Sequence, residues 1–256
     1  MPKIVSIHSF RGGTGKSNVT ANLATAVASS GHRVGIVDTD IQSPGMHVLF
    51  GFDEQRMGYS LNDYLWGKCQ IEDTAYDVSD TFQDISYSNS KIYLIPSSIK
   101  TGDIAKILHE GFDFSLLQTG LRNLVRILNL DYLFIDTHPG LNEETLLSLT
   151  LSDTLAIILR PDQQDFQGTA LTVEIAKKLE VPDMFLVFNK VLSSLDLNSL
   201  KQAAEKNYKI PVVEILLYCE EMMELASNGI FCIHYPTHPF TTSIATIVQH
   251  IISHKT

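Results

Sequence analysis

A glycine-rich run around one lysine carries the clearest chemistry in this sequence. Residues 11–17 read Arg-Gly-Gly-Thr-Gly-Lys-Ser, after an apolar segment at 3–8 and before a helix-like segment at 17–29. Glycines let the backbone curl so that successive N–H groups point at one anion, and the following helix adds the positive end of its dipole. Lys16 can reach the β- and γ-phosphates, and the Ser17 hydroxyl can bind Mg²⁺. The run therefore predicts a site for a nucleoside triphosphate with magnesium.

Two further apolar segments end in carboxylates. Residues 34–38 read as a buried strand that ends in Asp38 and leads into Asp40, and residues 132–135 lead into Asp136 and then Thr-His-Pro-Gly. Ligands of open α/β sheets bind at the carboxyl ends of the strands, where an aspartate can hold a water molecule on Mg²⁺. Either segment alone is a weak signal. Together with the glycine-rich run, and in this order, they indicate one nucleotide site.

The spacing of the glycine-rich run departs from the usual G-x-x-x-x-G-K-[ST] pattern. Phe10 stands where the first glycine would be, whereas Gly12 and Gly13 are adjacent and follow a cation, Arg11. This resembles the deviant Walker A motif, K-G-G-x-G-K-[ST], of the MinD/ParA family, and the resemblance extends from residue 3 to about 239. It implies an ATPase that forms an ATP-dependent homodimer around two ATP molecules. The first lysine of each subunit then reaches the phosphates of its neighbour.

The resemblance assigns catalytic and metal-binding roles to individual residues. Lys16, Asp40 and Arg11 are expected to be catalytic: Asp40 orients the attacking water, and Arg11 occupies the position of the signature lysine. The expected magnesium site is made by Ser17, Asp38 and Asp136. Hydrolysis by enzymes of this kind is expected to be slow.

An asparagine after a later strand completes the expected nucleotide site. Asn189 follows an apolar strand at 184–188 and corresponds to the family's adenine-recognising residue. Leu192 occupies the position of the aspartate in the guanine-reading N-K-x-D pattern, which favours adenine. The residues expected to bind ATP are Gly12, Gly13, Thr14, Gly15, Lys16, Ser17, Asn18 and Asn189.

Three residues depart from the family pattern, and each has more than one reading. The guanidinium of Arg11 can grip a neighbour's phosphate bidentately, or it can tether its own loop in cis. A dimer that uses another cation, or none, is a further alternative. The Asn18 amide can donate to an α-phosphate, or it can be an ordinary residue of the first helical turn. His138 can sense the nucleotide state, or it can lie at the surface or behind the site.

Apolar strands alternate with helix-like segments along the chain, which predicts an α/β fold. We expect a single doubly wound domain over residues 1–256, with a mostly parallel central sheet of about seven or eight strands and helices on both faces. Residues 53–89 lack long periodicity and read as an insertion-like irregular region. Strands are expected at 3–8, 33–38, 91–96, 131–136, 153–159, 184–189 and 212–216. Helices are expected at 16–30, 60–66, 112–130, 143–151, 166–179, 196–207, 220–227 and 241–253.

Composition favours a cytoplasmic protein without a membrane anchor. The chain has 256 residues, 44% of them hydrophobic, and no apolar run reaches about 18 residues. The C-terminal segment at 241–256 is amphipathic but nearly free of cations, so we expect it to pack on the domain. A net charge of −10 makes DNA binding unlikely but possible through a local patch such as Arg122 and Arg126 or Lys177 and Lys178. The three cysteines are widely spaced and read as reduced packing thiols.

These features favour a Mg²⁺-dependent ATPase that acts as a nucleotide-controlled dimer switch. It would position or regulate a cellular cargo through an unidentified protein partner or cargo adaptor. Three alternatives remain open: an ATP-binding scaffold with negligible turnover, an ATP-dependent enzyme that activates a small carboxylate, and a DNA-segregation ATPase.

Overall fold

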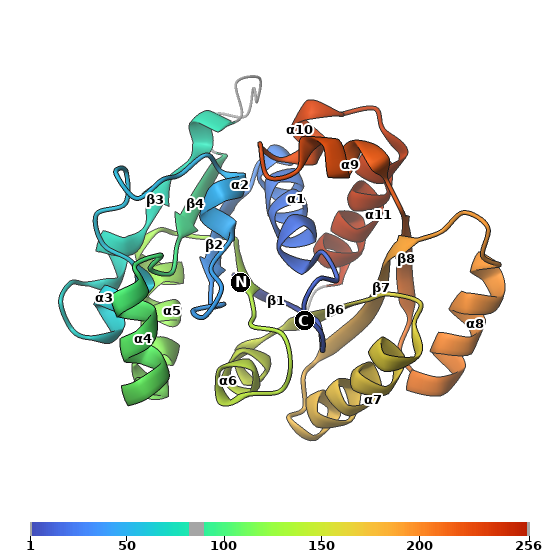
Figure 1. Cartoon of the computed structure of the whole chain (residues 1–256), viewed down its shortest axis with the longest axis horizontal. Coiled ribbons are helices and arrows are strands. Elements are labelled where there is room, and N and C mark those ends of the chain that lie inside the picture. The colour runs from blue at the N-terminus through green and yellow to red at the C-terminus, as the bar shows by residue number, and fades with distance from the viewer. Residues whose placement is uncertain (1, 82–89, 255–256) are drawn as a thin grey trace.

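Eight strands form one sheet in the order β3-β4-β2-β5-β1-β6-β7-β8 (Figure 1). This computed structural model describes residues 2–81 and 90–254. Every neighbouring pair is parallel except β3 and β4. The predicted seven or eight mostly parallel strands are thus confirmed. The strands are β1 (Lys3–His8), β2 (Arg33–Asp38), β3 (Tyr76–Asp77), β4 (Lys91–Ile95), β5 (Tyr132–Asp136), β6 (Thr154–Leu159), β7 (Asp183–Val191) and β8 (Val212–Leu217).

Strand β1 lies between β5 and β6, so the strand order reverses at the start of the chain. Crevices at such a reversal, at the carboxyl ends of the strands, are where doubly wound sheets bind ligands. The glycine-rich loop (residues 11–17) leaves β1 at this point and enters α1. The helices are α1 (Lys16–Ser29), α2 (Met46–Leu49), α3 (Leu61–Leu65), α4 (Thr101–Glu110), α5 (Phe114–Ile127), α6 (Glu143–Leu151), α7 (Gln163–Lys178), α8 (Leu197–Tyr208), α9 (Glu220–Leu225), α10 (Phe231–His234) and α11 (Pro239–Ser253).

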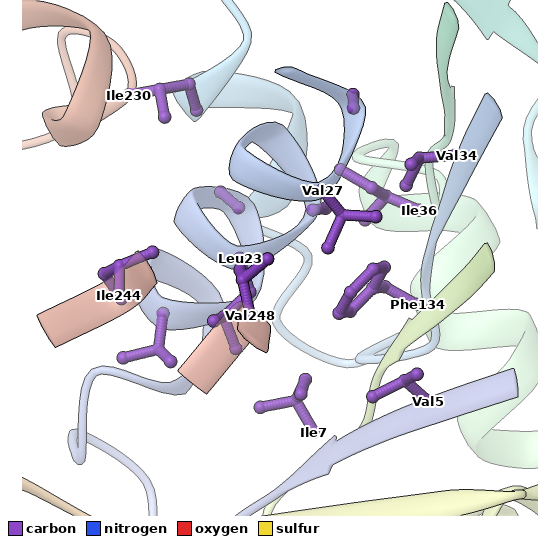
Figure 2. Packing of buried hydrophobic residues seen from close by; sticks show 14 of the residues in the cluster. Val5, Ile7, Leu23, Val27, Val34, Ile36, Phe134, Ile230, Ile244 and Val248 are labelled. Atoms are coloured by element: carbon purple, nitrogen blue, oxygen red, sulfur yellow. The ribbon is translucent and has the colours of Figure 1, made fainter. Parts of the chain in front are cut away.

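Helices cover both faces of the sheet, as the sequence predicts, because the buried strands alternate their side chains between two cores. On one face, α1 and α11 lie side by side on the sheet, and Figure 2 shows Val27 of α1 near Phe134 of β5 and Leu23 of α1 near Val248 of α11. The opposite face carries two clusters, one under α3, α4 and α5 and the other under α7 and α8. The glycine-rich loop therefore connects two buried elements, β1 and α1.

The C-terminal helix is packed against the domain, as its apolar spacing predicts. Its apolar face is buried with α1 and β8, and the buried side chains are Phe240, Ile244, Ile247, Val248 and Ile251. The Lys3 ammonium donates to the carbonyls of Ile251 and His254, at 3.0 and 2.6 Å, and so caps the end of the helix. None of the helices among the described residues is long and apolar enough to cross a membrane.

The insertion-like region at 53–89 is more regular in its described part than the sequence predicts. Residues 53–81 include α3, two 3₁₀ turns, η1 (Ile71–Thr74) and η2 (Ser79–Thr81), and the edge strand β3, while residues 82–89 lie outside the description. The sequence analysis also missed α4, a ten-residue helix that lies largely at the surface and buries only Ile107. Among the candidate basic residues, Lys177 donates to the Tyr208 carbonyl at 2.8 Å, so its charge is engaged within the fold.

Candidate nucleotide-binding site

The glycine-rich loop has the backbone geometry of an anion cradle. Gly13 and Gly15 have φ of 78° and 89°, a left-handed region that glycine adopts without strain. Gly15 is the N-cap of α1, and its carbonyl accepts the first helical bond from the Val19 N–H at 3.0 Å. A Cβ on Gly15 would also lie 2.5 Å from Nδ2 of Asn189. Glycine is therefore required there both by the turn and by the close approach of β7.

Asp136 at the end of β5 joins the loop to the sheet. It is almost fully buried, and its Oδ1 pairs with the Lys16 ammonium at 2.8 Å. Its Oδ2 accepts a hydrogen bond from the Ser17 hydroxyl at 2.7 Å, and the Thr20 hydroxyl donates to Oδ1 at 2.8 Å. The hydroxyl of Ser17 and the carboxylate of Asp136 are hard oxygen donors of the kind that Mg²⁺ prefers. These residues therefore fit a magnesium ion.

Asp38 at the end of β2 is fully buried and is already occupied by the backbone. Its Oδ1 accepts from the Asp40 N–H at 3.0 Å, and its Oδ2 accepts from the N–H groups of Gly45 and Met46 at 3.1 Å each. Burial, reinforced by the charge of Asp136, raises the pKa of Asp38 to about 7. In this structure Asp38 thus shapes the loop after β2 and lies opposite Asp136 in the strand register.

Asp40 and His138 face each other across the mouth of the loop. Asp40 lines the cavity beside the glycine-rich loop, which we call the phosphate cavity. Its Oδ1 accepts a hydrogen bond from the Ser43 N–H at 3.1 Å, and burial raises the pKa of its carboxyl. The His138 Nε2 lies 3.8 Å from Oδ1 of Asp40, and its Nδ1 lies 2.6 Å from the Pro139 carbonyl. His138 is therefore part of the site in this structure and not a remote surface residue.

Arg11 makes contacts within its own chain. Its Nη1 lies 3.5 Å from Asp162 and 3.7 Å from Asp165, at the start of α7, and the side chain is 39% exposed. Arg160 shares both carboxylates, with Nη2 3.2 Å from Asp162 and Nε 3.1 Å from Asp165. This is the cis tether that the sequence analysis considered as one reading. The α7 partners could not be predicted from the sequence, because they lie about 150 positions away from Arg11.

Phe10 anchors the loop on the same helix. A Cβ on Gly168 of α7 would lie 1.9 Å from Cδ1 of Phe10, so the ring rests directly on the glycine backbone. This contact explains why an aromatic residue stands where an ordinary phosphate loop has its first glycine. Neither Phe10 nor Gly168 was identified as a site residue, because a contact between a loop and a helix distant in sequence leaves no local pattern.

Two cavities meet at the loop. One, of about 210 Å³, is lined by residues 12–18 together with Ser9, Asp40 and Pro139. The other, of about 230 Å³, is lined by Gly15, Asn18, Val19, Asn189, Lys190, Leu217, Tyr218, Cys219, Met222, Met223, Ala226, Ser227 and Phe240. Gly15 and Asn18 line both, so a phosphate chain in the first can continue into a ring system in the second. Sequence reasoning found Asn189 in this second cavity, the base cavity, but missed the residues after β8.

Asn189 and Lys190 close the base cavity against the loop. The Asn189 amide donates to the Thr14 carbonyl at 2.8 Å, and the Lys190 ammonium donates to the Gly13 carbonyl at 2.9 Å. Lys190 has a φ of 58°, an uncommon conformation for a residue with a side chain. The end of β7 thus holds the carbonyl side of the loop, which leaves the N–H groups to face a ligand.

Comparisons with known proteins agree with this architecture. The family model described as an AAA domain matches residues 2–184. An uncharacterized ATP-binding protein of Methanocaldococcus jannaschii is 26% identical over 98% of this chain and 88% of its own. The septum site-determining protein MinD of Bacillus subtilis is 29% identical over 90% of this chain and 81% of its own.

Solved structures share the fold from end to end. The cell division ATPase MinD of Pyrococcus furiosus superimposes with a TM-score of 0.82, at 23% identity, over 99% of both chains. MinD of Pyrococcus horikoshii, solved with Mg-ADP, gives a TM-score of 0.81 at 22% identity, over 98% of this chain and 96% of that one. The match of the AAA-domain model to most of the chain, together with these relatives, shows that the chain belongs to the MinD/ParA family of P-loop ATPases.

Proposed function

We propose that this protein is a Mg²⁺-dependent ATPase whose ATP-bound homodimer positions or regulates a cellular cargo. The observation that carries the proposal is the junction of the two cavities at Gly15 and Asn18, beside the buried Lys16–Asp136 pair. An anion cradle, a cation, hard oxygen donors and a base cavity are what a nucleoside triphosphate with magnesium requires. The septum site-determining role named for the Bacillus subtilis relative supports the positioning part.

The roles within the site follow from the side chains present. With nucleotide bound, Lys16, which now pairs with Asp136, would contact the β- and γ-phosphates. Ser17 and Asp136 would hold Mg²⁺, which would supply positive charge to the phosphates. Asp40 lies on the wall of the phosphate cavity and orients the attacking water. The chain contributes placement and charge and makes no covalent bond to the phosphate, so turnover is expected to be slow.

Arg11 is the residue proposed to act across the dimer. Its two carboxylate partners are also held by Arg160, so each keeps one cationic contact when Arg11 leaves them for a neighbour's phosphates. A guanidinium suits this exchange because it grips carboxylate and phosphate oxygens with the same fork of donors. The cis contact would then belong to the monomer, and the trans contact to the ATP-bound dimer.

A phosphate-release assay tests the enzymatic part of the proposal. The wild type should hydrolyse ATP only with Mg²⁺, and Asp40→Asn should lose at least about tenfold in rate while still binding ATP, because only the attacking water loses its guide. ATP binding without measurable release would support a nucleotide-dependent scaffold instead. Release that begins only when a small carboxylate is added would point to an enzyme that activates that carboxylate.

A further inference from the structure

Three side chains that the phosphate chemistry does not use meet beside the base cavity. Cys219 is the N-cap of α9, Glu221 lies in the first turn of that helix, and His238 is the N-cap of α11. The Cys219 Sγ lies 3.3 Å from Oε2 of Glu221 and 4.0 Å from Nε2 of His238, and the last two atoms are 3.7 Å apart. In the described part of the chain, this is the one group of three such ligand atoms so closely placed.

The triangle has nearly the dimensions of a tetrahedral zinc site. Zinc bonds of about 2.3 Å to sulfur and about 2.0–2.1 Å to nitrogen and oxygen place neighbouring ligand atoms about 3.3–3.6 Å apart at the tetrahedral angle. The observed edges of 3.3, 3.7 and 4.0 Å need to shift by only a few tenths of an ångström to reach that geometry. A sulfur, a nitrogen and one oxygen also suit zinc far better than magnesium or calcium, which prefer oxygen alone.

We infer that Cys219, Glu221 and His238 form a binding site for one thiophilic divalent cation, with zinc as the ion that fits best. Three protein ligands leave the fourth position of a tetrahedral zinc for water, and Cys219 also lines the base cavity. The site is distinct from the predicted magnesium site at Ser17, Asp38 and Asp136, which offers oxygen donors only. The sequence analysis read Cys219 as a packing thiol because His238, 19 positions away, is brought close to it only by the fold.

The protons in the cluster must be rearranged when the cation binds. The Cys219 thiol now donates to Glu221, and burial raises the pKa of the thiol, so the cation takes the place of the thiol proton and one proton leaves to solvent. The His238 Nδ1 accepts from the Phe240 N–H at 3.0 Å, which keeps the ring proton on Nε2. Binding through Nε2 therefore shifts the ring proton to Nδ1 and replaces that capping bond with a metal bond.

Cobalt(II) is the probe that separates this site from the nucleotide site, because only a thiolate ligand gives a sulfur-to-cobalt absorption band. Metal-free, reduced, full-length protein is titrated with CoCl₂ and then with ZnCl₂. The expected result is one cobalt per chain with that band, displaced by one equivalent of zinc. Absence of the band in the wild type overturns the inference.

Matched variants test the assignment residue by residue. Cys219→Ser and His238→Ser should each weaken cobalt binding by at least about 100-fold, and the serine at 238 can still cap α11. Cys232→Ser, which removes a cysteine outside the cluster, should bind like the wild type. Zinc should raise the thermal midpoint of the wild type and leave that of Cys219→Ser unchanged, a second readout for folded variants. A cobalt band that persists in Cys219→Ser contradicts the site.

Discussion

The contact between Phe10 and Gly168 predicts a mutation whose cost in stability depends on the side chain at position 10. In Gly168→Ala, the new Cβ would lie 1.9 and 2.1 Å from two ring carbons of Phe10, where ordinary carbon contacts begin at about 3.5 Å. The ring, or the loop that carries it, must move by about 1.6 Å. Overpacking of this kind costs about 1–3 kcal/mol, partly offset by the roughly 1 kcal/mol by which alanine favours a helix over glycine. We therefore expect a net loss of stability of up to about 2 kcal/mol.

Removing the ring should relieve most of the cost. In a Phe10→Ala background the ring carbons are gone, but the Cβ of residue 10 would still lie 2.7 Å from the new Cβ. Gly168→Ala should therefore cost at least about 1 kcal/mol less there than in the wild type. Gly102→Ala in α4, where nothing lies within 4 Å of the added Cβ, measures the helix preference alone. Chemical denaturation of the four variants and the wild type gives the coupling between positions 10 and 168 directly.

The same displacement should reach the nucleotide. Phe10 immediately precedes Arg11 and the loop glycines, and misplacing a binding loop by about 1 Å can reduce activity by about 100-fold. Titration with a fluorescent ATP analogue and phosphate release should both show the loss in Gly168→Ala. If this variant kept wild-type stability and ATP affinity, the loop would not be anchored on α7 and the reasoning would fail.

Three further predictions concern the buried charges and the base cavity. Lys16→Ala should destabilise the nucleotide-free protein by about 3 kcal/mol by leaving Asp136 buried without its cation, and Asp136→Asn in the same chain should recover part of this loss in denaturation experiments. The pKa of Asp38 is raised, so the folded state binds more protons than the unfolded state between about pH 4 and 7. The free energy of unfolding should therefore fall as pH rises through that window. If Asp38→Asn showed the same dependence of unfolding free energy on pH as the wild type, this prediction would be wrong. Asn189→Ala should weaken ATP binding by about tenfold, measured by calorimetry, because the loop loses its bond to Thr14; equal affinities in the two proteins would refute that role.

Much of the fold could be predicted because its signals are local. Each of the seven predicted strands is observed, since buried parallel strands are short continuous apolar runs bounded by polar turns. Strand β3 and helix α4 were missed for the opposite reason. The first has two residues, too few to show an alternation, and the second is a short helix that buries only Ile107. Their presence is determined by packing on β4 and on the neighbouring helices, which the sequence does not display.

In the candidate site, too, some residues could be predicted from the sequence and others could not. The residues around Lys16, Asp40 and Asp136 were found because phosphate and magnesium binding impose local motifs at strand ends. The α7 partners of Arg11 and the walls of the base cavity after β8 were not found. They combine residues from distant parts of the chain, and their side-chain types carry no pattern of their own.

The most direct test of the account is the solution mass with and without nucleotide. Light scattering on wild type, Arg11→Ala and Arg160→Ala should be measured without nucleotide, with Mg-ADP and with Mg-ATP. The dimer switch predicts that ATP alone doubles the mass of the wild type from 28.5 kDa, that Arg11→Ala stays monomeric, and that Arg160→Ala still dimerises. A mass that does not depend on nucleotide, or an Arg11→Ala protein that dimerises like the wild type, would contradict the proposed role of Arg11 across the dimer.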